Sequence, residues 1–318
     1  MNITGIRRRA GALAVVGGMV MGATLASAGS AQAVTDYQIG TFNMAGGHDT
    51  HGPKGNEAPD ALVESVKSRK PGFVVLQEAC RDWTDRLGNE LRDYEYTVTF
   101  DPVQKSRSGP ESTSEPGPTA KCKHPSDFGN AILYRNNFGI DAVDPGRLLT
   151  TRQEDQREEQ REMLCVRAEA KKIVVCSLHL SQADKVDARR TEAREAKHIL
   201  AKKYAGYTQF VGGDLNDGPS SAATDNFYHR DYGYGAHGEL KEVDSPCGND
   251  MKPRADSFPI ACRRGETTSD DWPFGEDRPT GGKKIDYIFV SPSVKVRWGD
   301  ATTAIHSDHD PLWAGVNF

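Results

Sequence analysis

The sequence lacks several features that would define a class of protein at once. It has no excess of basic residues, because 40 Lys and Arg stand against 45 Asp and Glu, for a net charge of −5. Binding to nucleic acid through bulk charge is therefore excluded, and any such contact has to be local. None of the six cysteines lies in a Cys-x-x-Cys pair or at zinc-site spacing from a histidine, which argues against a zinc site. No internal repeat is evident.

The first 33 residues are typical of a targeting segment rather than of a fold. Arg7, Arg8 and Arg9 precede an apolar run rich in Gly and Ala, which ends in the small-residue site Ala-Gln-Ala. This pattern indicates a secretory signal, and we expect cleavage after Ala33. A membrane anchor is the alternative, but the run has few strongly apolar residues and no basic stop-transfer flank follows it. The three arginines leave Sec and twin-arginine export both open.

Residues 34–318 are long enough to form one large domain, and we expect a single domain over this range. Without the signal, 37 Lys and Arg face 45 Asp and Glu, for a net charge of −8. All six cysteines lie in this part, and an even number after a secretory signal indicates disulfides in an extracellular protein. Connectivity does not follow from the sequence alone. We propose Cys165–Cys176 across a predicted hairpin, Cys247–Cys262 around a short loop, and Cys80–Cys122 from the two that remain.

Short apolar or alternating runs predict a protein in which strands outnumber helices. Helices are predicted over 58–70 and 81–93 from apolar residues spaced three and four apart, and 183–204 is the longest helix candidate. Strands are predicted over 37–42, 72–77, 94–100, 130–135, 163–170, 172–178, 208–213, 284–290, 294–298 and 312–316. Two sheets packed face to face with helices outside accommodate this composition. The stretch 228–282 is rich in loops and matches no assigned pattern.

Polar side chains recur where the predicted strands end or begin. A single Asp or Asn in such a place is most often a turn residue, and a single His is most often structural. Six such places on one chain are harder to explain in that way. Carboxylate and amide oxygens suit Mg²⁺ or Mn²⁺, and His–Asp pairs suit proton transfer. The residues are Asn43, Glu78, His179, Asp214 with Asn216, Asp286, and Asp308 with His309.

The order of these motifs resembles the endonuclease/exonuclease/phosphatase superfamily. "GGDLN" at 212–216 and "SDHDPLW" at 307–313 carry most of the resemblance, which extends from Asn43 to Trp313. The superfamily includes pancreatic-type deoxyribonuclease I, apurinic endonucleases, bacterial sphingomyelinases and inositol polyphosphate phosphatases. The resemblance implies a four-layer α/β sandwich with two mixed β-sheets and helices outside. It also implies hydrolysis of phosphate esters with a divalent ion, Mg²⁺ or Mn²⁺.

The resemblance also implies a role for each residue. Glu78 would bind the metal, with Asn43 and Asp308 close to the ion. His309 would be a catalytic histidine oriented by Asp286, and Asp214 would align or deprotonate the attacking water. His179 and Asn216 would hold or protonate phosphate oxygens. Attack on a phosphodiester concentrates negative charge, so a cation and hydrogen-bond donors are needed where that charge develops.

Two positions leave alternatives open. Arg161 resembles the family's phosphate-binding arginine, but it also belongs to the charged run "TRQEDQREEQRE", where it would be one more solvated charge. Asp310 stands where many members have an aromatic or apolar residue. Its carboxylate would either add negative charge near the site or face solvent.

The favoured function is a secreted metal-dependent phosphodiesterase, with nucleic acid as the favoured substrate, acting as a monomer. The alternatives are a sphingomyelinase-type lipid phosphodiesterase, a phosphatase, or a catalytically inactive binding or toxin-like module on the same fold. Lipid-cleaving relatives carry exposed apolar loops that dock on membranes. The one candidate here, around Trp272 and Phe274, is flanked by four acids, so we expect no stable insertion into a membrane.

Overall fold

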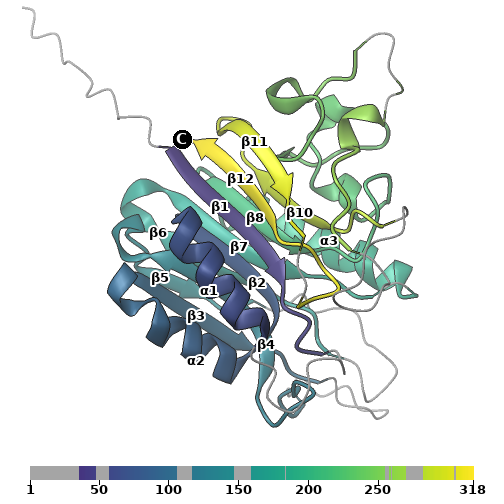
Figure 1. Ribbon diagram of the computed structural model, residues 1–318. Helices are drawn as coiled ribbons and strands as arrows, with labels where there is room; N and C mark the ends of the chain where they lie inside the picture. The colour runs from purple at the N-terminus through teal and green to yellow at the C-terminus, as the bar shows by residue number, and fades with distance from the viewer. Residues whose placement is uncertain are drawn as a thin grey trace, which may run out of the picture. The chain divides into compact units, whose positions relative to one another are not determined.

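Two six-stranded sheets form the centre of the protein (Figure 1). The computed structural model describes residues 36–47, 57–105, 117–146, 159–182, 184–254, 258, 260–269, 282–303 and 306–318. The first sheet has the order β11-β12-β1-β2-β4-β3 and the second the order β5-β6-β7-β8-β10-β9. The first contains β1 (Asp36–Asn43), β2 (Phe73–Cys80), β3 (Tyr96–Pro102), β4 (Phe128–Arg135), β11 (Lys295–Ala301) and β12 (Leu312–Asn317). The second contains β5 (Ala142–Asp144), β6 (Met163–Ala168), β7 (Ile173–His179), β8 (Thr208–Asp214), β9 (Lys241–Glu242) and β10 (Asp286–Val290).

Each sheet is mixed and contains one parallel pair. Strand β1 runs parallel to β2, and β7 runs parallel to β8, while the other neighbouring strands are antiparallel. Parallel neighbours end at the same edge of a sheet, so His179 at the end of β7 lies beside Asp214 at the end of β8. Strand β10 runs the other way, and its first residue, Asp286, pairs with Asp214. The topology thus collects polar residues at one edge.

The two sheets pack face to face through an apolar layer. Side chains alternate along a strand, so Phe73 and Val75 of β2 point into this layer while Val74 and Leu76 point outward. The layer draws its other members from both sheets, among them Ile39, Ile132, Val166, Val175, Phe210, Ile288 and Val316.

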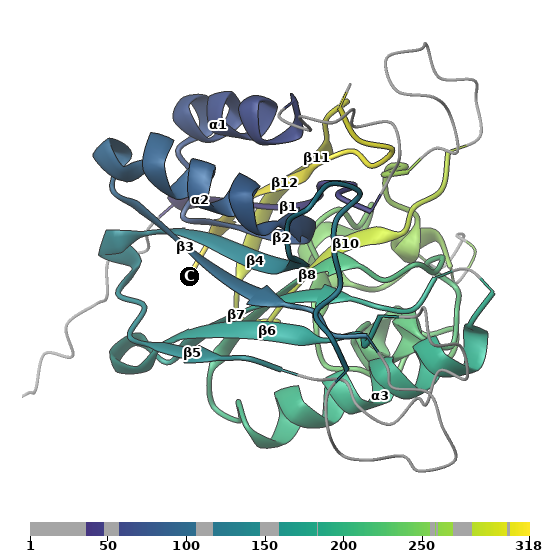
Figure 2. The same cartoon turned by 90° about the horizontal axis from the view of Figure 1, so that it is seen from below.

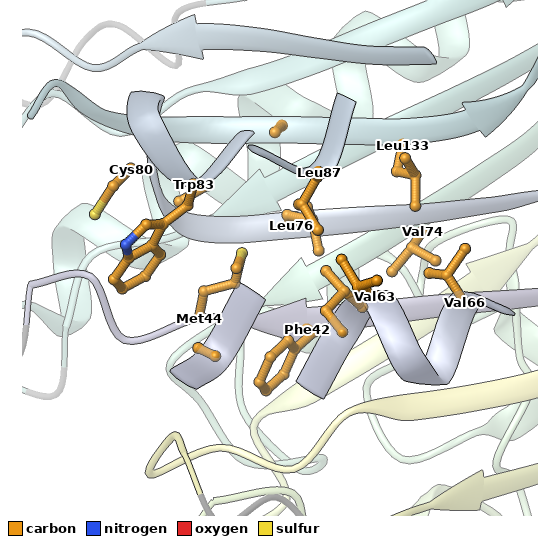
Figure 3. Close-up of a cluster of buried hydrophobic side chains, with 14 of the residues drawn as sticks. Phe42, Met44, Val63, Val66, Val74, Leu76, Cys80, Trp83, Leu87 and Leu133 are labelled. Carbon is orange, nitrogen blue, oxygen red and sulfur yellow. The ribbon is translucent and has the colours of Figure 1, made fainter. Parts of the chain in front are cut away.

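Helices cover the outer faces of both sheets. Helices α1 (Glu57–Arg69) and α2 (Arg81–Glu90) lie on the first sheet, where Val63 and Leu87 pack against Leu76 (Figure 3). Helix α3 (Val186–Lys202) covers the second sheet with Ala193, Ala196 and Leu200. Figure 2 shows the resulting order of helix, sheet, sheet and helix. The predicted four-layer α/β sandwich is therefore confirmed.

The structure differs from the expected elements at a few places. Helix α2 stops at Glu90 rather than at residue 93, because Leu91 leaves the helical conformation and a 3₁₀ turn follows at Arg92–Tyr94. Strands β5 and β9, of three and two residues, were not expected because they are too short to show a period. The described part of 228–282 consists mainly of turns and short 3₁₀ helices.

All three predicted disulfides are confirmed. Cys165 and Cys176 lie directly opposite each other in the β6–β7 ladder. Cys80 joins Cys122, and Cys247 joins Cys262 across 15 residues of chain. The predicted signal segment and the loop with Trp272 and Phe274 lie outside the described residues. In the part of the chain that is described, no helix has the length and apolar character needed to cross a membrane.

Candidate active site

The candidate active site lies where the two sheets end side by side. Each sheet contributes residues, and the turn before β12 adds the last two. The first sheet supplies Asn43 and Glu78, the second supplies His179, Asp214 and Asp286, and the turn supplies Asp308 and His309. Asn216 follows β8 and Arg161 precedes β6, so all nine predicted residues lie within the described part of the chain.

Asn43 contacts three of the other predicted site residues. Its Nδ2 donates to Asp214 Oδ2 at 3.1 Å and to Glu78 Oε1 at 3.3 Å, and it lies 3.5 Å from His309 Nε2. Its Oδ1 accepts a hydrogen bond from the Ala45 amide at 2.9 Å, which fixes the orientation of the side-chain amide. One fully buried amide therefore contacts a residue of its own sheet, a residue of the opposite sheet and the turn before β12.

Glu78 occupies an irregular position in β2. The ladder between β2 and β4 shifts register between Leu76 and Ala79, and Glu78 has a φ of +48°. Its Oε2 accepts from the Gly47 amide at 3.0 Å. Burial raises the pKa of the Glu78 carboxyl, and repulsion from the carboxylates of Glu159 and Asp308 raises it further.

The repulsion between these carboxylates indicates whether a divalent cation would fit the site. Oxygen donors that repel one another favour a hard cation between them, because the ion removes the repulsion. Glu78 and Asp308 meet this description. A second acidic group, Asp214 with Asp286 and His309, has its donor atoms within 4.8 Å of one another, but Asp286 and His309 are already hydrogen-bonded there. Glu78 and Asp308 are therefore the better candidates to hold a metal.

His309 forms a buried pair with Asp286. Its Nδ1 lies 2.8 Å from Asp286 Oδ2, and its backbone amide donates to Ser307 Oγ at 3.1 Å. Ser307 in turn donates to the carbonyl of Asn43 at 2.7 Å. Burial alone would lower the pKa of His309, but the carboxylates of Asp286 and Asp214 outweigh it and raise the pKa well above its usual value. The imidazole is therefore held in its charged form.

Asp214 lies between the two histidines. Its Oδ2 is 3.5 Å from His179 Nε2 and 3.8 Å from His309 Nε2, and its Oδ1 accepts from the Asn216 amide at 2.7 Å. Burial raises the pKa of Asp214 to about 7, although the charge of His309 opposes this. A carboxylate with such a pKa can accept a proton near neutral pH.

His179 is held by Arg161 and Asn216. Arg161 Nη1 lies 3.0 Å from His179 Nδ1, and Asn216 Nδ2 lies 3.2 Å from His179 Nε2. Burial lowers the pKa of His179, and the charge of Arg161 lowers it further, so the ring is neutral. Of the two interpretations of Arg161, the structure favours a place in the site, since only a tenth of its side chain is exposed.

Three supporting residues were missed in the sequence. Glu159 forms an ion pair with Arg161 at 3.2 Å. It belongs to the charged run "TRQEDQREEQRE", in which no single acidic residue stands out. Thr268 Oγ1 accepts the Asp286 amide at 2.9 Å, and the Thr268 carbonyl accepts the Asp310 amide at 2.7 Å. Ser307 belongs to the motif "SDHDPLW", but the sequence assigned it no role.

Asp310 is 2% exposed, so the alternative in which its carboxylate faces solvent is wrong.

Comparisons with known proteins bear on the family and on the fold. The sequence profile of the Endonuclease/Exonuclease/phosphatase family matches residues 40–309. Among curated proteins no sequence matches. Solved structures with a similar fold include the endonuclease/exonuclease/phosphatase from Bacteroides vulgatus, at 17% identity and a TM-score of 0.58, covering 89% of this chain and 98% of its own.

Two further structures show how varied the similar proteins are. D. rerio TDP2, complexed with single strand DNA product, is 16% identical with a TM-score of 0.61, over 89% of this chain and 100% of its own. The mannosyl-6-phosphatase Bt3783 of Bacteroides thetaiotaomicron VPI-5482 is 15% identical with a TM-score of 0.61, over the same shares. These structures establish a shared fold, and the match of the profile over most of the sequence establishes the family. The chain belongs to the Endonuclease/Exonuclease/phosphatase family.

Proposed function

We propose that the protein is a divalent-metal-dependent phosphodiesterase, with nucleic acid as its substrate. Enzymes of its family hydrolyse phosphoric esters and use divalent metals. One observation carries the proposal for this chain. Asn43 contacts Glu78, Asp214 and His309 at once, so a metal-type carboxylate, a candidate base and a charged histidine converge on one point.

The buried charges suggest how the chain's own groups act on a phosphodiester. Asp214, oriented by Asn43 and Asn216, accepts a proton from the attacking water, whose oxygen forms the new bond to phosphorus. His309, held by Asp286, donates its proton to the oxygen that departs when the phosphorus–oxygen ester bond breaks. A base of raised pKa next to a charged acid is the arrangement that such proton transfers need.

The phosphate itself would be held on two sides. Glu78 and Asp308 would bind Mg²⁺ or Mn²⁺, with Asn43 close to the ion. When bound, such a cation neutralises negative charge on the phosphate and on the departing oxygen. On the other side, Arg161 supplies a permanent positive charge. His179 is neutral, so its role is to hydrogen-bond a phosphate oxygen rather than to protonate it.

Nucleic acid is favoured over lipid because nothing in the described part of the chain provides a membrane-docking surface. Its large exposed apolar residues are scattered singly, at Tyr94, Val143, Val186, Tyr234, Phe258 and Trp298. An inactive module is disfavoured because Asn43 joins Glu78, Asp214 and His309, and because Asp286 holds His309. The predicted signal and the three disulfides support a secreted protein.

A side-by-side assay of the purified protein tests the proposal. Plasmid DNA, RNA, sphingomyelin, inositol phosphates and a sugar phosphate are each incubated with Mg²⁺ and with EDTA. We expect cleavage of DNA or RNA in Mg²⁺ and none in EDTA. The Asp214→Asn variant should lose cleavage of every substrate, whereas Asp187→Asn on the exposed face of α3 should not. Rapid sphingomyelin or phosphomonoester cleavage with intact plasmid would overturn the nuclease assignment, and full activity in EDTA would overturn the metal dependence.

A further inference from the structure

A buried polar chain crosses the apolar layer between the two sheets. Gln77 of β2 accepts a hydrogen bond from Thr41 Oγ1 at 3.2 Å, and its Nε2 donates to Ser177 Oγ of β7 at 2.9 Å. Ser177 Oγ donates back to the carbonyl of Leu76 at 2.9 Å. Thr41, Gln77 and Ser177 are all fully buried, and within the described residues the hydrogen bonds of their side chains go to one another and to the Leu76 carbonyl.

The surroundings of this chain are apolar. Val75 of β2 and Val175 of β7 belong to the same inter-sheet cluster as Phe210 and Ile288. Burying a side-chain amide or hydroxyl in such a layer destabilises the fold unless the group is hydrogen-bonded with good geometry. The two bonds between Ser177 and β2 therefore favour one spacing and one register of β2 against β7, whereas apolar contacts alone would tolerate small shifts.

The position of the chain in the sequence gives it a consequence for the site. Gln77 immediately precedes Glu78, and Ser177 lies two residues before His179. The Gln77 carbonyl accepts from the Met44 amide at 2.9 Å, and the Glu78 carbonyl accepts from the Gly46 amide at 3.0 Å. These bonds fix the turn after β1, from which the Gly47 amide reaches the Glu78 carboxylate.

Glu78 needs such support because of its backbone. A φ of +48° in a residue other than glycine is a strained backbone conformation, and it persists only where neighbouring contacts impose it. The ladder to β4 is irregular at this point, so the regular hydrogen bonds of the sheet do not impose it. The side-chain bond from Gln77 to Ser177 and the return bond to Leu76 lie directly before the irregular residue.

We propose that Gln77 and Ser177 form an inter-sheet tie that positions Glu78 opposite His179 and Asp214, and so sets the affinity of the site for its divalent cation. Gln77 is then a positioning residue, which acts through Glu78 and touches neither substrate nor metal. The inference rests on the proposed metal dependence. It goes beyond that proposal because Gln77 and Ser177, which are not proposed metal ligands, would influence how tightly the site binds its cation.

The test uses direct binding of Mn²⁺ to the purified protein by isothermal titration calorimetry. Gln77→Met keeps the volume of the side chain and removes both hydrogen bonds, and Ser177→Ala removes the hydroxyl. Partners behind metal ligands are typically worth about 10- to 100-fold in metal affinity, so each variant should raise the Kd for Mn²⁺ at least about tenfold. The double variant should bind about as weakly as either single variant, because both remove one tie.

Ser245→Ala is the matched control, because Ser245 Oγ donates to a buried carbonyl, that of Cys262, at 2.7 Å away from the site. It should lower Tm by about as much as Ser177→Ala and leave the Kd for Mn²⁺ unchanged. Ser177→Thr, which keeps a hydroxyl, should restore most of the affinity. If the folded Gln77→Met and Ser177→Ala proteins bind Mn²⁺ with wild-type affinity, the proposed role of the inter-sheet tie is wrong, while the proposed metal dependence still stands. A wild-type protein that binds no Mn²⁺ would instead overturn the proposed metal dependence.

Discussion

The pair of Asp286 and His309 allows the most quantitative prediction. The Asp286→Asn change keeps the shape of the side chain and removes its charge. Asp286 Oδ1 has no hydrogen-bond partner among the described residues, so the new amide nitrogen can take that place while an oxygen remains 2.8 Å from His309 Nδ1. The change therefore tests charge with little disturbance of packing.

The structure bounds the size of the effect. Two unit charges 2.8 Å apart attract by about 6 kcal/mol at an effective dielectric constant near 20, which is an upper limit. A charge-assisted hydrogen bond is worth only about 1.5–3 kcal/mol net, because desolvation offsets most of the attraction. Asp214, 3.8 Å from His309 on its other side, still attracts the ring. We expect kcat/KM to fall about 10- to 100-fold.

The assay measures kcat/KM on bis(p-nitrophenyl) phosphate and on supercoiled plasmid in Mg²⁺. Both substrates should lose activity by a similar factor, because the pair acts on the reacting bond and not on distant parts of a nucleic acid. Asp225→Asn is the control, since it removes a charge from a buried pair with Arg263 that lies outside the site. It should lower stability and leave kcat/KM unchanged. An Asp286→Asn enzyme within twofold of wild type would refute the role given to the pair.

Three further changes have expected outcomes. Glu78→Gln should raise the Mg²⁺ concentration for half-maximal activity at least about tenfold, and EDTA should abolish wild-type activity until Mg²⁺ or Mn²⁺ is added back; unchanged Mg²⁺ dependence would contradict the ligand role. Thr268→Val removes the acceptor for the Asp286 amide and should cost about 1–3 kcal/mol in unfolding free energy, together with a loss in kcat that Thr268→Ser restores; a stability loss without a loss in kcat would leave Thr268 a purely structural residue. Replacing Cys165 and Cys176 by Ala should lower the free energy of unfolding in urea by about 3 kcal/mol at unchanged kcat/KM, and equal stability would show that this bridge does not constrain the unfolded chain.

The parts of the fold that follow a period could be predicted from the sequence. Strand β2 begins with a short apolar run, and α1 contains apolar residues three and four apart; the structure has a strand and a helix at these places. The edge where the site lies was also predictable, because Asn43 and Asp214 interrupt such runs with groups that would be costly to bury alone.

The supporting contacts could not be predicted because they depend on tertiary pairing. Thr268 lies in a segment without periodicity, and only the fold brings it against the Asp286 amide 18 residues away. Gln77 stands inside an apolar run, where its neighbour Glu78 drew attention as the ionisable residue. Its partner Ser177 is 100 residues distant. Sequence patterns locate residues along one strand, whereas these bonds join strands that no local signal relates.

The place of β12 makes the candidate site depend on contacts between segments that are distant in the sequence. This strand lies between β11 and β1 in the first sheet, and its Asn317 pairs with Asp36 of β1, which is 281 positions earlier in the sequence. His309 arrives only with the same final stretch. A chain cut before residue 306 therefore lacks both the histidine and the strand beside β1, which ends in Asn43. Contacts between such distant segments also form late and slowly. The candidate site is therefore complete only when β12 has joined the first sheet beside β1.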